Sequence, residues 1–198
     1  MQPQLVSPLY VRVTHWINAL AVFVMISSGL KIYNASPIFD FLIPRSVTLG
    51  GWLGGALLWH FAAMWLLVAN GLVYLACNAA TGRLWKKFFP ITPRALLDDT
   101  RRALRGELSH DDLSKYNSIQ KAAYVAAIAG CILLVLSGLA IWKPVQLALL
   151  RDLMGGFDNA RIVHFMAMTF IVFFIFIHVV MVALVPRTLL VMLSGRSR

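Results

Sequence analysis

The chain has 198 residues, of which 60% are hydrophobic, and it carries a formal net charge of +10 at pH 7. Its mean hydropathy of +0.76 lies far above the usual range for a soluble globular domain. The composition therefore excludes an ordinary soluble protein and indicates an integral membrane protein.

Four apolar segments are each long enough to cross a bilayer, because a hydrocarbon core needs about 20 helical residues. We expect membrane-spanning helices at about residues 9–32, 48–78, 118–142 and 160–185. The second segment carries four glycines near its start, which indicate a flexible or closely packed approach to the helix. No internal repeat is evident. The predicted fold class is all-α, with residues 1–198 forming a single domain, an integral membrane four-helix bundle.

Most of the eighteen lysines and arginines lie either in the connection at about residues 79–117 or at the chain ends. The positive-inside rule therefore predicts that both termini and this loop are cytoplasmic. We interpret the charge as a topology signal, with some attraction to anionic lipid headgroups, and expect no nucleic-acid partner. Within the loop, a surface helix is expected near Pro93 to Gly106.

Four of the five histidines lie inside the apolar segments, and His110 in the loop is interpreted as solvated. His164 and His178 are fourteen residues apart on the fourth span, which is almost a whole number of helical turns. Both rings therefore share one helix face, about 21 Å apart along the axis. The predicted depths match in two pairs: His60 with His164 in the outer half, and His15 with His178 in the inner half.

Histidine within a span is costly unless it lines a cavity, bonds a neighbouring helix or binds a ligand. A single example would favour interhelical hydrogen bonding, whereas four at paired depths favour ligand binding. Neutral imidazole is the commonest metal ligand and a usual axial partner of haem iron. Two haem b groups, each bound by two histidines, explain the two pairs of matching depth. Copper is the alternative metal, because the thioethers of Met166 and Met168 near His164 are soft ligands that suit it.

Other metal chemistry finds less support in the sequence. No acidic residue falls within a span, which disfavours a proton relay or a transporter of hard cations. The two cysteines lie on different spans without a CxxC or CxxCH motif. Covalent haem attachment and a cysteine-ligated iron–sulfur cluster are therefore unsupported.

An arginine precedes a histidine by three residues twice, in Arg12–His15 and in Arg161–His164. This spacing places each arginine on the face of its histidine, one turn nearer the water. Because a guanidinium suits carboxylates, Arg12 and Arg161 are candidate partners of haem propionates. The alternative is that these arginines only mark the ends of spans.

Polar groups gather where the third span begins, at Tyr116 to Lys121. Asn117 and Gln120 could hydrogen-bond a quinone carbonyl there. Helix capping by Asn117 or Ser118 explains the same residues equally well.

Over nearly its whole length, the chain resembles the bacterial di-haem cytochrome b subunits of hydrogenases, formate dehydrogenases and thiosulfate-reductase-type enzymes. The resemblance is carried by RVTHWIN from Arg12, His60, YNSIQK from Tyr116, Ser137–Leu139 and the spacing from RIVHF to His178. The surroundings of Asn117 and Gln120 and the Lys143-Pro144 turn are most similar to subunits associated with periplasmic molybdopterin oxidoreductases. The chain lacks the long C-terminal extension and the fifth helix of some members.

The resemblance implies an electron carrier in the bacterial inner membrane that links a periplasmic redox protein subunit to the quinone pool. It implies that His15 and His178 hold an inner haem b, and His60 and His164 an outer one. It also implies a quinone site near the inner haem, which favours Asn117 and Gln120. The alternatives are a self-contained quinone-linked oxidoreductase acting on a small molecule such as superoxide, a copper or haem transporter, and a cofactor-free membrane anchor.

Overall fold

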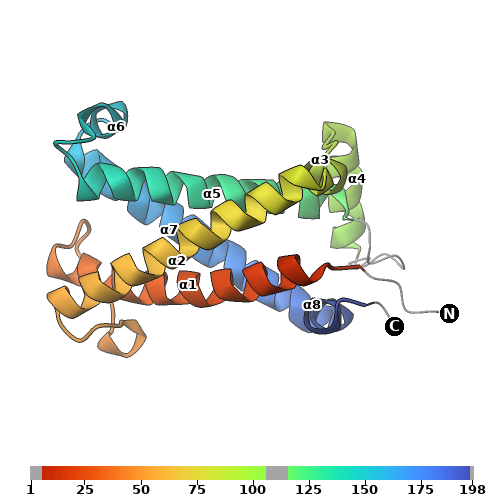
Figure 1. Ribbon diagram of the computed structural model, residues 1–198, viewed down its shortest axis with the longest axis horizontal. Helices are drawn as coiled ribbons and strands as arrows, with labels where there is room; N and C mark the ends of the chain where they lie inside the picture. Colours follow the sequence, from red (N-terminus) through yellow and green to blue (C-terminus); the bar gives the residue numbers. More distant parts are fainter. Residues whose placement is uncertain (1–5, 106–115, 197–198) are drawn as a thin grey trace. The chain divides into compact units, whose positions relative to one another are not determined.

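The structure is a computed structural model that describes residues 6–105 and 116–196, without the side chains of residues 103 and 104. Every element of regular structure named in this part of the chain is a helix (Figure 1). The apolar segments form four long helices: α1 (Leu9–Ala35), α2 (Leu53–Ala80), α5 (Ser118–Trp142) and α7 (Phe157–Leu184). Each is long and apolar enough to cross a membrane, which confirms the predicted all-α membrane fold.

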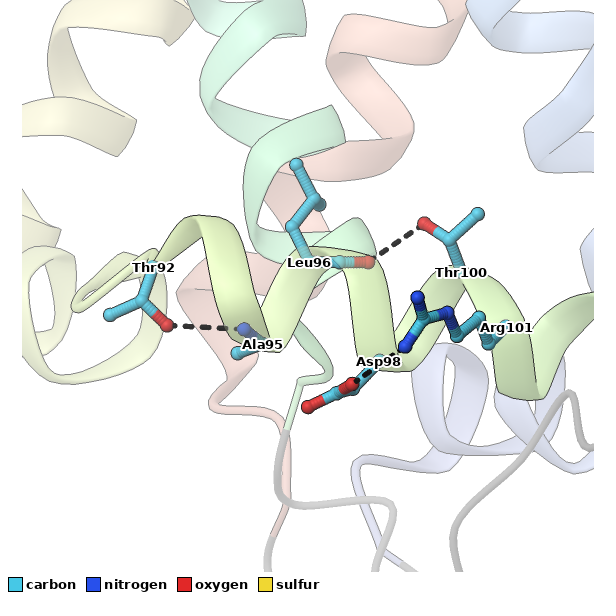
Figure 2. Close-up of polar contacts among 6 residues, drawn as sticks. All are labelled: Thr92, Ala95, Leu96, Asp98, Thr100 and Arg101. Carbon is cyan, nitrogen blue, oxygen red and sulfur yellow. Dashed lines mark hydrogen bonds and ion pairs between the residues drawn. The ribbon is translucent and has the colours of Figure 1, made fainter.

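Short helices occupy the connections: η1 (Arg45–Val47), α3 (Arg83–Phe88), α4 (Pro93–Leu104), α6 (Ala148–Leu153) and α8 (Arg187–Ser194). The α4 helix confirms the surface helix expected after Pro93. Thr92 caps its start, because its Oγ1 accepts a hydrogen bond from the Ala95 backbone N–H at 3.3 Å. Arg101 and Asp98 form an exposed ion pair one turn apart on this helix (Figure 2).

The α2 helix begins later than the start expected for the second span. Gly50 and Gly51 precede it with φ values of 106° and 69°, a left-handed conformation that side chains rarely tolerate. These glycines turn the chain into the helix at Leu53. The turn is as apolar as the helix, so hydropathy alone does not separate the two.

The described residues group into two compact units, and each long helix contributes to both. Unit 1 comprises Met1–Val13, Tyr74–Cys131 and Phe170–Arg198. Unit 2 comprises Thr14–Val73 and Ile132–Thr169.

The interior of unit 2 is made of small side chains. Ser28, Ala56 and Ser137 are 0% exposed, whereas the large side chains of Phe23 and Leu58 are 72% and 74% exposed. This distribution suits a lipid environment, where small residues let helices approach closely and large apolar side chains face the acyl chains.

A buried amide also joins α1 to α2 within unit 2. Asn70 Nδ2 donates hydrogen bonds to the carbonyl of Thr14 and to Asn18 Oδ1, each at 2.7 Å. Polar contacts of this kind hold membrane helices together where water is absent.

In unit 1, polar contacts join helix ends that are distant in sequence. The Tyr10 hydroxyl donates to Asn78 Oδ1 at 3.5 Å, which ties the start of α1 to the end of α2. Asp99 Oδ2 accepts from the Ser118 backbone N–H at 2.6 Å, so α4 supplies a carboxylate to the start of α5. Negative charge at that position stabilises a helix.

Candidate functional site

Two of the predicted ligands, His60 on α2 and His164 on α7, face each other within unit 2. Their ring centroids are 6.4 Å apart and their planes are inclined by 64°. Their depths in the predicted spans indicate this pair, and the structure brings the two rings together.

Each of these imidazoles contacts a serine on a different helix. Ser28 Oγ on α1 lies 3.1 Å from His60 Nδ1, and Ser137 Oγ on α5 lies 2.9 Å from His164 Nδ1. Each serine donates its single hydroxyl proton to the carbonyl four residues earlier in its own helix, at 2.6 Å and 2.7 Å respectively. The histidine therefore donates its Nδ1–H to the serine, and its Nε2 keeps the lone pair that a metal requires.

The donor set fits an iron atom between the rings. An imidazole nitrogen binds a metal at about 2 Å and lies about 1 Å from its ring centre, so two rings on opposite sides of one metal have centres about 6 Å apart. The observed separation is 6.4 Å. Metal-bound histidines usually donate their other ring N–H to a fixed acceptor, as both rings do here.

The other predicted pair is divided between the two units. His15 belongs to unit 2 and meets the ring of Trp16 edge-on, with centroids 5.3 Å apart. His178 belongs to unit 1 and stacks on Phe174, with centroids 5.9 Å apart. Their pairing about an inner haem stays a prediction.

The two arginines predicted to contact haem propionates, Arg12 and Arg161, differ in their surroundings. Arg161 donates to the carbonyl of Ser36 and to its Oγ, the latter at 3.2 Å, and pairs with Asp158 at 3.6 Å. Arg12 Nε is buried and has no hydrogen-bond partner within the described part of the chain. A buried guanidinium N–H without a partner is expected where a bound anion would complete the contact. Arg12 therefore fits a propionate better than Arg161 does.

Asn117 and Gln120 form a reciprocal capping box at the start of α5. Asn117 Oδ1 accepts from the Gln120 backbone N–H at 2.8 Å, and Gln120 Oε1 accepts from the Asn117 backbone N–H at 3.2 Å. The capping alternative thus describes what their side-chain oxygens do. These bonds do not use the two side-chain NH2 groups, which are the donors that a quinone carbonyl would need.

Aromatic rings lie beside this capping box in unit 1. The Tyr116 ring is 5.2 Å from Tyr124 and 6.3 Å from Phe88, and Lys87 Nζ lies 5.4 Å above it. Burial raises the pKa of the Tyr116 phenol, so the hydroxyl stays protonated at neutral pH.

Ser28 and Gly29 were not found from the sequence, although a signal for them exists. Ser28-Gly29-Leu30 is followed by Lys-Ile-Tyr, and Ser137-Gly138-Leu139 is followed by Ala-Ile-Trp. The same short pattern thus occurs on α1 and on α5, and both copies contact a histidine. A stretch of six residues is too short to be an internal repeat, so the expectation of no internal repeat stays a prediction.

Four apolar helices that enclose facing imidazoles define a membrane protein of the cytochrome b class. Residues 6–195 match the model of a family described as prokaryotic cytochrome b561, and the chain belongs to that family. The "Putative protein-methionine-sulfoxide reductase subunit YedZ1" of Azospira oryzae is 57% identical over 190 residues, which cover 96% of each chain. Family membership confirms a multi-pass bacterial membrane protein that binds b-type haem and serves electron transport.

Proposed function

We propose that the protein carries electrons through two b-type haems between the membrane quinone pool and a periplasmic redox enzyme. The observation that carries the proposal is the His60–His164 pair, with ring centroids 6.4 Å apart and each Nδ1 held by a serine. When bound, haem iron takes up and releases one electron at a time. His60 and His164 would supply nitrogen ligands to that iron, and the apolar spans would supply a surrounding of low polarity.

A second haem at His15 and His178 is supported by two independent features. The fourteen-residue spacing puts His178 on the helix face of His164. Arg12 lies one turn before His15 in sequence, and its buried Nε has no hydrogen-bond partner among the residues that the structure describes, so a propionate would supply an acceptor there. Two haems at different depths would let an electron cross the bilayer in two shorter steps.

We infer that the quinone binds in unit 1 near Asn117 and Gln120. Their side-chain NH2 groups are available to a carbonyl because the capping box uses only the oxygens. The neighbouring rings of Tyr116 and Tyr124 offer an apolar surface for a flat head group. Under the predicted topology, this end of the bundle is cytoplasmic.

The partner is proposed to be a periplasmic reductase that acts on oxidised methionine side chains, with molybdopterin as its own cofactor. The name of the Azospira oryzae relative supports the substrate class, and the resemblance to cytochrome b subunits of periplasmic molybdopterin enzymes supports the cofactor. Reduction of a sulfoxide to a thioether consumes two electrons and two protons and releases water. Oxidation of one quinol supplies both electrons, so electrons would flow outward.

A reduced-minus-oxidised visible spectrum with haem-to-protein stoichiometry tests the proposal. We expect two haems per wild-type chain, one in His164→Ala and one in His178→Ala. We expect two in the control His110→Ala, because His110 was predicted to be solvated; it lies outside the described residues. A wild-type protein without haem, or an unchanged ratio in His164→Ala, would contradict the proposal.

The partner is tested separately with the intact membrane protein. Quinol in proteoliposomes should reduce a co-purifying periplasmic protein and drive reduction of methionine sulfoxide in a test peptide. Haem reduction by quinol without transfer to such a partner would instead favour the self-contained oxidoreductase.

A further inference from the structure

The two Ser-Gly pairs hold their histidines in the same way. Each serine hydroxyl accepts the Nδ1–H of one ring, at 3.1 Å for His60 and 2.9 Å for His164. One serine hydroxyl on a neighbouring helix therefore holds one imidazole, and this arrangement occurs twice.

The glycine in each pair leaves room for the ring beside the serine. A helical side chain lies over the turn that precedes it, so a larger residue after the serine would crowd the imidazole. A Cβ added at Gly29 would lie 3.4 Å from His60 Cε1, and one at Gly138 would lie 3.3 Å from His164 Cε1. Each ring thus rests directly against the bare backbone of a glycine.

We propose that Ser28-Gly29 and Ser137-Gly138 act as paired clamps that set the orientation of both axial imidazoles and tune the reduction potential of the haem between them. The inference rests on the proposed haem at His60 and His164. All six residues belong to unit 2. The serines and glycines are positioning residues, since they act on the haem only through the two histidines.

The hydrogen bonds are expected to lower the potential of this haem. An Nδ1–H drawn toward an acceptor makes the imidazole more electron-rich, which stabilises ferric over ferrous iron. The clamp also holds the rings at an interplanar angle of 64°. That angle governs the splitting of the iron d orbitals and therefore the largest g value of the ferric low-spin electron paramagnetic resonance signal.

Ser137→Ala tests the electronic part of the proposal. The substitution leaves His164 Nε2 available to the iron, so haem should stay bound. Its preference for the ferric state should fall by up to roughly tenfold, a rise of about 59 mV in potential for a one-electron couple. Ser27→Ala is the matched control for Ser28→Ala. Among the described residues, the Ser27 hydroxyl bonds only within its own helix, to the carbonyls of Phe23 at 2.8 Å and Val24 at 3.2 Å. The second haem serves as an internal reference in each titration.

Gly138→Ala tests the geometric part. Its Cβ would require His164 to move by a few tenths of an ångström, whereas at Gly29 the contact is an ordinary one. We expect a larger change in the highest g value for Gly138→Ala than for Gly29→Ala. Gly71→Ala is the control, because a Cβ there meets no atom within 4 Å. Alanine favours helix over glycine, so folding should be preserved.

The outcomes separate this inference from the proposed function. If Ser137→Ala matches the wild type in potential and Gly138→Ala matches Gly71→Ala in g value while haem is fully bound, the inference fails and the proposed function stands. If His164→Ala removes no haem, the proposed function fails, and the clamp fails with it. If Ser137→Ala loses one haem while Ser27→Ala keeps both, the positioning role is supported, and Ser28→Ala then tests the shift in potential.

Discussion

Replacing Asn70 with alanine should loosen the contact between α1 and α2 while leaving every proposed ligand in place. Asn70 is 8% exposed and donates two hydrogen bonds of 2.7 Å to α1, one to the Thr14 carbonyl and one to Asn18 Oδ1. Thr14 precedes His15, so this amide also anchors the part of α1 that carries a predicted ligand.

The expected magnitude follows from the number of bonds and their surroundings. A hydrogen bond between membrane helices contributes about 0.6 kcal/mol on average and up to about 2 kcal/mol. Two bonds are lost and two acceptors are left inside the protein, so the free energy of unfolding should fall by about 2 kcal/mol. For a chain of this length, that loss lowers Tm by about 4–8 °C.

The assay is thermal unfolding of purified protein in one detergent, followed by near-ultraviolet circular dichroism. Asn159→Ala is the control, since the Asn159 amide bonds within its own turn to the Gly155 carbonyl at 3.0 Å. A Tm for Asn70→Ala equal to that of the control would refute the view that this amide holds the two helices together.

Two further predictions concern α5 and the cofactor. Asp99→Ala removes the carboxylate that accepts a hydrogen bond from the Ser118 backbone N–H at 2.6 Å. We expect the free energy of unfolding to fall by about 1 kcal/mol, measured as a decrease in Tm in the same detergent. An unchanged Tm would contradict this prediction. Protein produced with haem synthesis inhibited should unfold at a lower temperature than the pigmented protein, because a ligand that binds only the folded state stabilises it. Equal Tm values for both preparations would argue against bound haem as part of the folded structure.

Hydropathy predicts the four long helices because hydrocarbon requires some 20 consecutive apolar residues per crossing. It does not predict the start of α2, where Gly50 and Gly51 turn the chain through positive φ. The distinction lies in backbone conformation, and apolar composition is the same on both sides of the turn.

The His60–His164 pair was predictable because helix periodicity and span order together assign each residue a depth. The serines that contact the rings were not identified as partners of the histidines. The repeated Ser-Gly-Leu pattern singles out two stretches, but no sequence spacing links a residue on α1 to one on α2, or one on α5 to one on α7. For Asn117 and Gln120, the sequence already suggested helix capping. The structure adds that capping uses only their oxygens.

Arg12 and Arg161 show how surroundings separate residues that look equivalent in sequence. Both lie three residues before a histidine. The guanidinium of Arg161, however, donates a hydrogen bond to the Ser36 carbonyl and forms an ion pair with Asp158. Arg12 Nε is buried without a hydrogen-bond partner within the described residues. Such an atom is costly in a membrane protein unless an anion completes the contact.

Arg12→Gln should therefore weaken haem binding more than Arg161→Gln does. A charge-assisted hydrogen bond contributes about 1.5–3 kcal/mol, so Arg12→Gln should lower the affinity for one haem by roughly tenfold or more. The loss is measured by transfer of haem to excess apomyoglobin, followed at the Soret band. Arg161→Gln should mainly lower Tm, because its bonds join protein groups. Equal haem loss from both variants would show that Arg12 Nε does not bind a haem propionate.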